Sequence, residues 1–231
     1  MSKSEKRKNW GEEIWEEKAV TQGEIGVIHG VEGSEKSIKE SQAEVMENLD
    51  SEFLPLVKGK KALDAGVGPL ARYSIEFRRK GYDVTGVDIS ETTLKFAKKN
   101  IEKEGYKGIK LVKDDLVELK KIKGKYDLVF CIGTFGHIPS FLALNTLKSF
   151  NRVLKKEGFC IVDIWMKEEL NFSRMMRGIL YNSARLIKKK FKKTFDVNCS
   201  TYTLGEISEM AKMSGFRIIK RKENFFLLKK I

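Results

Sequence analysis

A carboxylate followed by a glycine-rich turn is the feature of this sequence with the clearest chemical meaning. Asp64 closes a short apolar segment, and Gly66 and Gly68 follow it directly. Glycine lets the backbone turn sharply and lets a ligand approach the main-chain amides. A second carboxylate, Asp88, ends the next apolar segment, where it can accept hydrogen bonds from ribose hydroxyls. The pattern therefore predicts a site for a nucleotide-like ligand.

The charge on Asp64 narrows the choice of ligand. The same turn, read from Gly66 to Ala71, also satisfies the fingerprint of dinucleotide-binding proteins, and Pro69 fits the first turn of a following helix. Asp64 would repel a pyrophosphate and attract a ligand with a positive amino group. A nicotinamide dinucleotide is therefore the weaker alternative, as is a turn whose glycines serve tight packing alone.

Alternating strand and helix patterns surround these residues. Between residues 61 and 166, apolar segments of strand length alternate with segments of helical periodicity. This alternation predicts an α/β fold with a doubly wound, mostly parallel sheet covered by helices on both faces. The carboxyl ends of parallel strands share one edge, so Asp64 and Asp88 are expected to meet there. The strands are expected at 61–65, 83–88, 109–113, 126–131 and 158–165, and the helices near 70–80, 91–104 and 141–155.

The C-terminal residues predict one further helix and a hairpin. Thr203 is placed to cap a helix that ends near Met213. Two short apolar segments, 216–221 and 225–230, then flank a turn. We therefore expect the sheet to have seven strands and to end in an antiparallel hairpin.

With these elements in place, the sequence resembles the class I S-adenosylmethionine-dependent methyltransferases. In that family a strand ends in an acid that is followed by Gly-x-Gly-x-Gly; here Leu70 replaces the third glycine. The terminal hairpin distinguishes the family from ordinary dinucleotide-binding folds. The resemblance is strongest over residues 58–166. It implies that the chain is an enzyme that binds S-adenosyl-L-methionine and transfers its methyl group by in-line displacement.

The resemblance also implies roles for particular residues. Asp88 would bind both ribose hydroxyls of the cofactor, and Ile89 would pack on its adenine. An acid after the third strand would bind the adenine amino group, with Asp114 the preferred residue and Asp115 the alternative. The cofactor-binding residues implied in this way are Asp64, Gly66, Gly68, Asp88, Ile89, Asp114, Asp115, Leu116 and Ile132.

A general base is required only if the methyl acceptor keeps its proton at the working pH. His137, in the loop after the fourth strand, is the natural candidate, because imidazole titrates near pH ~6.5. Its alternative role is to order this loop by hydrogen bonding. Asp163 and Trp165 close the fifth strand at the same edge, where they would contact a substrate amine and form a cation–π wall, or else pack as core or lid.

Composition limits the compartment and the partners. The chain has no apolar run of about 18 residues, and its first eight residues contain no hydrophobic stretch. Its three cysteines lack metal-ligand spacing and fit a reducing cytosol. We therefore expect a cytoplasmic protein with no secretory signal, membrane span or metal. The net charge of +13 makes RNA or an anionic surface an alternative partner.

Residues 167–200 interrupt the alternation of strands and helices. They carry nine Lys or Arg residues against three acids, together with apolar residues at helical spacing. This pattern predicts a basic helical lid over the active site; docking on RNA or on a membrane surface is the alternative. The expected divisions of a single domain, 1–231, are a helical cap (1–57), a cofactor-binding core (58–166), the lid (167–200) and the last helix with its hairpin (201–231).

The methyl acceptor is expected to be a small molecule. An RNA- or protein-directed methyltransferase is one alternative, and a non-catalytic, methyltransferase-like module that binds RNA is another. The residues near the N-terminus are expected to fold over the cofactor, with Trp10 and Trp15 at the substrate entrance or packed on the sheet.

Overall fold

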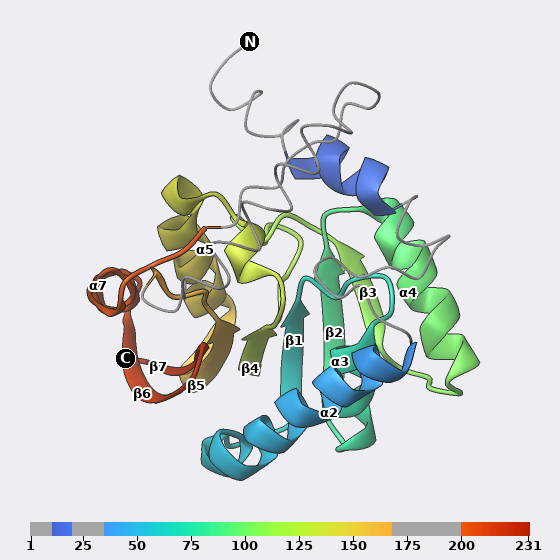
Figure 1. Ribbon diagram of the computed structural model, residues 1–231, viewed down its shortest axis with the longest axis horizontal. Helices are drawn as coiled ribbons and strands as arrows, with labels where there is room; N and C mark the ends of the chain where they lie inside the picture. Colours follow the sequence, from blue (N-terminus) through green and yellow to red (C-terminus); the bar gives the residue numbers. More distant parts are fainter. Residues whose placement is uncertain (1–10, 20–34, 168–199) are drawn as a thin grey trace.

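A computed structural model describes residues 11–19, 35–167 and 200–231 (Figure 1). Within these ranges the strands form one seven-stranded sheet of order β3-β2-β1-β4-β5-β7-β6. Neighbours among the first five strands run parallel, and β7 runs antiparallel to both β5 and β6, which confirms the predicted sheet. The strands are β1 (Lys61–Ala65), β2 (Asp83–Asp88), β3 (Lys110–Lys113), β4 (Tyr126–Cys131), β5 (Leu154–Asp163), β6 (Phe216–Lys222) and β7 (Phe225–Lys230).

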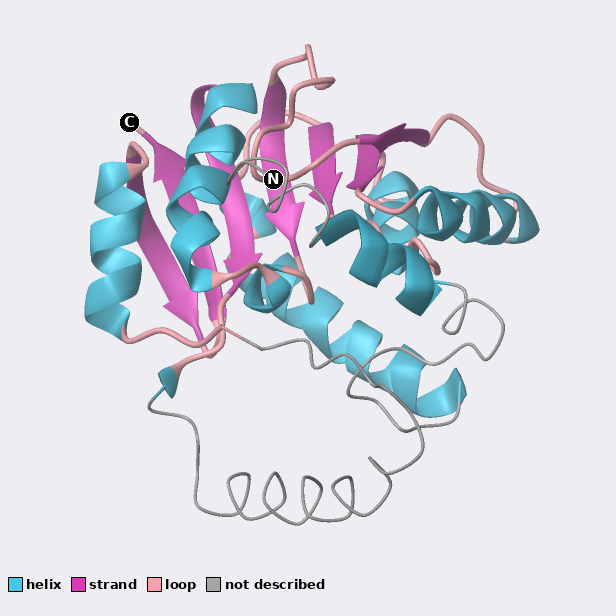
Figure 2. Cartoon of the chain, turned by 90° about the horizontal axis from the view of Figure 1, so that it is seen from above, coloured by secondary structure: helices cyan, strands magenta, loops and turns pink. Residues whose placement is uncertain are grey.

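Helices cover the sheet on both faces (Figure 2), because the central strands carry apolar side chains on both. In β4, Val129 and Cys131 enter the core that α5 and α7 cover, whereas Leu128 and Phe130 enter the core that α2 and α3 cover. The ring of Phe130 stacks on that of Phe77 from α3, with centroids 4.1 Å apart. The helices are α2 (Glu35–Glu52), α3 (Arg72–Arg79), α4 (Glu91–Lys103), α5 (Ser140–Val153) and α7 (Leu204–Met213), with 3-10 turns η1 (Leu54–Leu56) and η2 (Phe135–His137).

Side chains cap the starts of two helices, and the cap at Thr203 is the predicted one. The Ser90 side chain accepts a hydrogen bond from the Thr93 amide at the start of α4. Thr203 and Glu206 form a reciprocal capping box at the start of α7. Each side chain satisfies an amide that the first helical turn leaves without a partner. The two caps therefore fix the residues at which α4 and α7 begin.

Two predicted boundaries are wrong. The helix α3 begins at Arg72 and follows Ala71, whose φ is +47°, so Pro69 lies in the preceding turn and not in the first turn of the helix. The strand β5 begins at Leu154, because α5 runs directly into it, and ends at Asp163. Its pairing with β4 shifts register after Leu154, and this irregularity hid the start of the strand.

The N-terminal helical segment 11–19 lies above the carboxyl edge of the parallel strands (Figure 1, blue). Trp10 and the interior of the predicted lid lie outside the described residues. At the borders of that interior, Met166 and Tyr202 form a parallel bridge. None of the helices in the described ranges is long and apolar enough to span a membrane. The four divisions of the domain stay a prediction.

Candidate active site

A cavity of about 210 Å³ opens at the carboxyl edge of the parallel strands. Its walls come from the turn after β1, from the residues that follow β2, β3 and β4, and from the helical segment 11–19. Most of the residues that the sequence had indicated line this one cavity. They are Gly66, Gly68, Asp88, Ile89, Asp115, Leu116, Ile132 and His137.

The two glycines of the turn after β1 serve different purposes. Gly66 has a φ of +93°, and a Cβ there would lie 2.3 Å from the Thr134 side chain, so Gly66 lets this turn pack against the loop after β4. Gly68 has a φ of +64° and open space where a Cβ would be. Leu70, at the position of the missing third glycine, also lines the cavity.

Asp88 is held at the cavity by main-chain amides. Its Oδ2 accepts a hydrogen bond from the Gly68 amide at 3.2 Å, and its Oδ1 accepts one from the Ser90 amide at 3.1 Å. Burial raises the pKa of Asp88 to about 6, and these amides act in the opposite direction. The carboxylate is therefore fixed in place, and its remaining lone pairs can accept hydrogen bonds from a ligand.

Asp64 does not line the cavity, contrary to the expectation that it meets a ligand. Its side chain is only 3% exposed, and its Oδ2 accepts a hydrogen bond from the Ser74 hydroxyl of α3 at 2.7 Å. Burial raises the pKa of Asp64 to about 7. The side chain thus joins the end of β1 to α3.

This burial predicts a pH-dependent stability. An unfolded aspartate has a pKa of about 3.9, so from about pH 4 to about pH 7 the unfolded chain releases a proton that the folded chain retains. Stability is therefore lost as the pH rises. In the unaltered protein, the free energy of unfolding is expected to fall between pH 5 and pH 8. In Asp64→Asn this fall is expected to be smaller by about 2–3 kcal/mol, as measured by urea titrations at the two pH values. Asp83→Asn, at the exposed start of β2, is the control; an equal effect of Asp64→Asn at both pH values would contradict the assignment.

Of the two acids at the end of β3, Asp115 lines the cavity, and Asp114, the preferred residue, does not. Both oxygens of Asp114 accept main-chain hydrogen bonds, from Asp115 at 2.9 Å and from Lys121 at 2.6 Å. Asp114 thereby folds the loop after β3 and is buried. Asp115 accepts a hydrogen bond from the Val117 amide at 2.9 Å and lies beside Leu116 on the cavity wall.

His137 lies at the end of η2 and lines the cavity between two tryptophans. Its ring centroid is 5.4 Å from that of Trp15 and 5.7 Å from that of Trp165, and both pairs meet edge to face. The Ser200 amide donates to the Gly136 carbonyl at 2.7 Å, which ties the end of the insertion to this loop. The geometry fits both predicted roles of His137, as a base at the cavity and as a residue that orders the loop.

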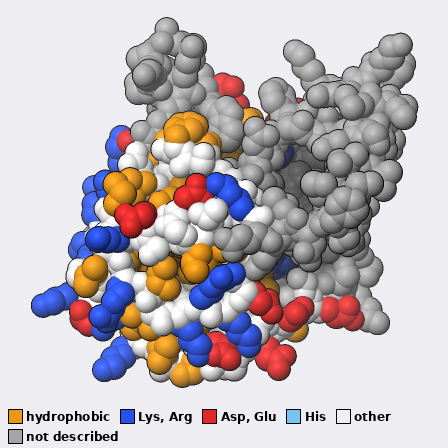
Figure 3. All heavy atoms as spheres, turned by 60° about the vertical axis from the view of Figure 1, so that its left-hand side comes forward, with side chains coloured by type: hydrophobic (Ala, Val, Ile, Leu, Met, Phe, Trp, Pro, Cys, Tyr) orange, Lys and Arg blue, Asp and Glu red, His pale blue; other side chains and the backbone are white. Residues whose placement is uncertain are grey.

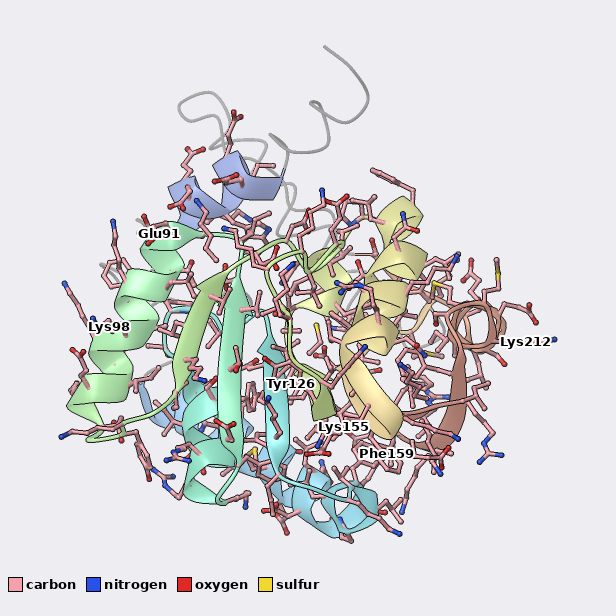
Figure 4. The ribbon with its side chains drawn as sticks, turned by 180° about the vertical axis from the view of Figure 1, so that it is seen from behind. Glu91, Lys98, Tyr126, Lys155, Phe159 and Lys212 are labelled. Atoms are coloured by element: carbon pink, nitrogen blue, oxygen red, sulfur yellow. The ribbon has the colours of Figure 1, made fainter. Side chains whose placement is uncertain are left out.

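The helical segment 11–19 covers the cavity and is anchored by acids. Glu12 pairs with Lys113 of β3 at 2.7 Å, and Glu16 accepts hydrogen bonds from the first amides of α4. Burial acts to raise the pKa of Glu16, but the hydrogen bonds that it accepts outweigh burial and lower the pKa. Figure 4 shows Glu91 at the end of α4 next to this segment. Gly11 and Trp15 line the cavity, as expected of a segment that folds over a cofactor.

Arg72 is a cavity residue that the sequence did not reveal. It is the first residue of α3, and its guanidinium lies over the Tyr73 ring, 4.8 Å from the centroid. No carboxylate in the described ranges lies within ion-pair distance of the guanidinium. A basic residue shortly after the glycine turn was the signal that could have indicated it.

Comparison with known proteins identifies the family to which the chain belongs. A family model described as a methyltransferase domain matches residues 56–221. The chain belongs to the class I S-adenosylmethionine-dependent methyltransferases. The magnesium protoporphyrin IX methyltransferase from Synechocystis, solved with S-adenosylmethionine bound, has the same fold. The two superpose with a TM-score of 0.61 over 90% of this chain and 88% of that chain, at 18% identity.

Relatives of this methyltransferase act on different acceptors. The human EEF1A lysine methyltransferase 2 is 30% identical over 145 residues, which are 57% of this chain and 58% of the human protein. The ubiquinone biosynthesis O-methyltransferase of Acinetobacter baylyi is 34% identical over 101 residues, which are 43% of this chain and 41% of that protein. The chain thus spans only about two fifths to three fifths of these curated relatives.

The cavity of this methyltransferase fits the cofactor of its family. The open space at Gly68 leaves room for a ligand against the main chain. Asp88 offers a fixed carboxylate, and Ile89 and Leu116 offer apolar surface beside it. The carboxylate suits a ribose with two hydroxyls, and the apolar surface suits a flat adenine ring.

Proposed function

We propose that this protein transfers a methyl group from S-adenosylmethionine to a small-molecule acceptor. The observation that carries the proposal is the cover over the cavity: Gly11 and Trp15 line it from above, and Glu12 and Glu16 anchor their helical segment to β3 and α4. A covered cavity favours an acceptor that enters it whole. Methyl transfer also benefits from a site that excludes water.

The cofactor-binding roles are assigned to residues of the cavity wall. Asp88 accepts hydrogen bonds from the ribose hydroxyls, Ile89 packs on the adenine, and Asp115 binds the adenine amino group. Leu116 and Ile132 complete the apolar surface, and the main chain at Gly66 and Gly68 lies against the ligand. Arg72, whose guanidinium has no carboxylate partner in the described ranges, binds the carboxylate of the methionine part. Asp64 and Asp114 support this wall from behind.

When bound, S-adenosylmethionine supplies a methyl group on a positively charged sulfur. The protein's part is to hold the acceptor atom in line with that methyl group and to keep water out. Trp15 and His137 line the cavity, and Trp165 packs against His137, so these aromatic rings are suited to this task. Where the acceptor carries a proton to be removed, His137 accepts it.

The charge distribution on the surface of the described residues favours an RNA acceptor less than a small-molecule acceptor. On the face drawn in Figure 3, Lys and Arg side chains are interspersed with Asp and Glu and with apolar side chains. Several lysines of the described ranges also form ion pairs, such as Lys167 with Glu206 and Lys229 with Glu157. Such mixed charge is typical of a solvated surface.

A labelling experiment tests the proposed function. The protein is incubated with S-adenosylmethionine that carries a labelled methyl group and with a cell extract divided into small molecules, RNA and protein. Label is expected in the small-molecule fraction. Label in the RNA or protein fraction would contradict the small acceptor. Failure to bind S-adenosylhomocysteine, measured by calorimetry, would contradict the enzyme function itself.

A further inference from the structure

Asp163, the last residue of β5, has a carboxylate oxygen without a hydrogen-bond partner. Its Oδ2 accepts a hydrogen bond from the Gly133 amide at 2.9 Å. Its Oδ1 is shielded from solvent, and none of the described residues donates a hydrogen bond to it. A buried carboxylate oxygen is costly when it has no donor, so such an atom marks a place where a ligand donor is expected.

The position of Asp163 brings this carboxylate to the border of the cavity. Val162 pairs with Cys131 at the end of β4, so Asp163 stands beside the two residues that follow, Ile132 and Gly133. Both of those residues line the cavity. The hydrogen bond from the Gly133 amide holds the carboxylate against the same wall. In the strand order, Asp163 of β5 and Asp88 of β2 lie on opposite sides of β1 and β4.

The surroundings of Asp163 leave its negative charge without a close partner. Burial raises its pKa to about 6, while the Gly133 amide and the more distant charge of Arg72 lower it. The carboxyl is therefore ionised at neutral pH. Arg72 forms no ion pair with it in the described ranges. A neutral hydroxyl could donate a hydrogen bond here, but only a cation would also balance the charge.

Aromatic rings lie beside the cavity beyond the end of β5, where Trp165 contacts His137 of the cavity wall. Trp165 follows Asp163 by two residues, and its ring packs over Gly136, where a Cβ would lie 3.3 Å from the indole. Trp165 and Trp15 both contact His137 through ring edges. Aromatic faces attract organic cations. A carboxylate two residues before an aromatic side chain that borders the cavity through His137 therefore favours a protonated amine and disfavours an anionic acceptor.

We propose that the methyl acceptor is an amine, whose ammonium form binds beside Asp163 and against the ring of Trp165. This inference rests on the proposed function. The ammonium first gives one proton to Oδ1 of Asp163. The nitrogen lone pair then forms the new carbon–nitrogen bond with the methyl group, while the carbon–sulfur bond breaks and its electron pair stays on sulfur. The proton on Asp163 leaves to solvent as the products depart.

The chemical class of the labelled product tests this proposal without knowledge of the acceptor. The full chain is incubated with methyl-labelled S-adenosylmethionine and each fraction of the extract, and unreacted cofactor is removed on charcoal. RNA and protein fractions are hydrolysed, and all products are applied to a cation exchanger. An N-methyl product is expected to be retained and to survive base. Label in neutral or acidic products, or label released by base as methanol from a methyl ester, would overturn the proposal.

A variant separates the acceptor role from a cofactor role. Asp163→Asn is expected to lower the labelling rate at saturating cofactor about tenfold or more and to change the affinity for S-adenosylhomocysteine less than about twofold. Asp83→Asn, which changes the exposed first residue of β2, is the control. Thermal melts check that each variant is folded. If Asp163→Asn instead weakens S-adenosylhomocysteine but not 5′-methylthioadenosine, which lacks the amino-acid part, Asp163 binds the cofactor's own ammonium and the proposal is wrong.

The two proposals fail in different ways. A protein that does not bind S-adenosylhomocysteine contradicts the proposed function and leaves no reaction for Asp163. A protein that binds it and labels only oxygen or sulfur atoms keeps the proposed function and loses the amine acceptor. Binding with no label in any fraction counts against both, because the extract contains the amines of small molecules and of proteins.

Discussion

Asp88→Ala is expected to lower the affinity for S-adenosylhomocysteine at least about 100-fold, since a hydrogen bond to a charged group contributes about 1.5–3 kcal/mol and two ribose hydroxyls are involved. Asp88 is suited to this role because the Gly68 and Ser90 amides fix its carboxylate at the cavity wall. The loss is measured by calorimetry with the full chain. Because the pKa of Asp88 is about 6, affinity in the unaltered protein is also expected to weaken as the pH falls below about 6.

Two controls make the Asp88 result specific. Asp83→Ala removes an exposed carboxylate from the opposite end of β2 and is expected to leave the affinity unchanged. An analogue of S-adenosylhomocysteine without the 2′-hydroxyl should bind the unaltered protein more weakly and lose less on the substitution, because one of the two hydrogen bonds is already absent. Equal losses for both ligands would show that Asp88 acts on the shape of the glycine turn and not on the ribose.

The parallel strands were predictable from the sequence to within a residue or two, apart from the ends of β5. Strands that are buried on both faces appear as continuous apolar runs, and the glycine turn and helix caps mark where they end. The strand β5 was the exception because α5 runs into it without a loop. Residues 155–157, which end at Glu157 with a φ of +62°, are exposed and polar, and they carry no strand signal.

The side to which each acid points was not predictable. Adjacent residues of an extended chain point in opposite directions, so an error of one residue exchanges the buried side chain for the ligand-facing one. This is the difference between Asp114, which binds the loop amides, and Asp115, which lines the cavity. The partner of Asp64, the Ser74 hydroxyl of α3, is likewise set by the docking of that helix.

The cover over the cavity was predictable only in outline. The sequence indicated a helical cap whose residues near Trp15 fold over the cofactor. Its anchors, Glu12 on Lys113 and Glu16 on the first amides of α4, join residues that are far apart in the sequence. No local pattern distinguishes these two acids from the other glutamates of the segment, since each is defined only by what it meets in the folded chain.

Arg72→Gln is expected to lower the affinity for S-adenosylhomocysteine about 30-fold and to leave the affinity for 5′-methylthioadenosine unchanged. The reason is that Arg72 lines the cavity at the start of α3 and forms no ion pair with the described carboxylates, so its guanidinium is available to the methionine carboxylate. A charge-assisted hydrogen-bonded pair that excludes water contributes about 2 kcal/mol, which corresponds to this factor. Calorimetry with the two ligands separates the amino-acid part of the cofactor from its nucleoside part.

The matched control for Arg72 is Arg79→Gln at the other end of the same helix. Arg79 is exposed and binds Glu76 and the Tyr106 hydroxyl, away from the cavity, so its loss should change neither affinity. If Arg72→Gln weakened both ligands equally, Arg72 would act by shaping the glycine turn, whose last residue, Ala71, has a left-handed backbone. If neither ligand were weakened, the methionine carboxylate would have to bind another donor, and the assignment of the α3 end of the cavity to the amino-acid part would be wrong.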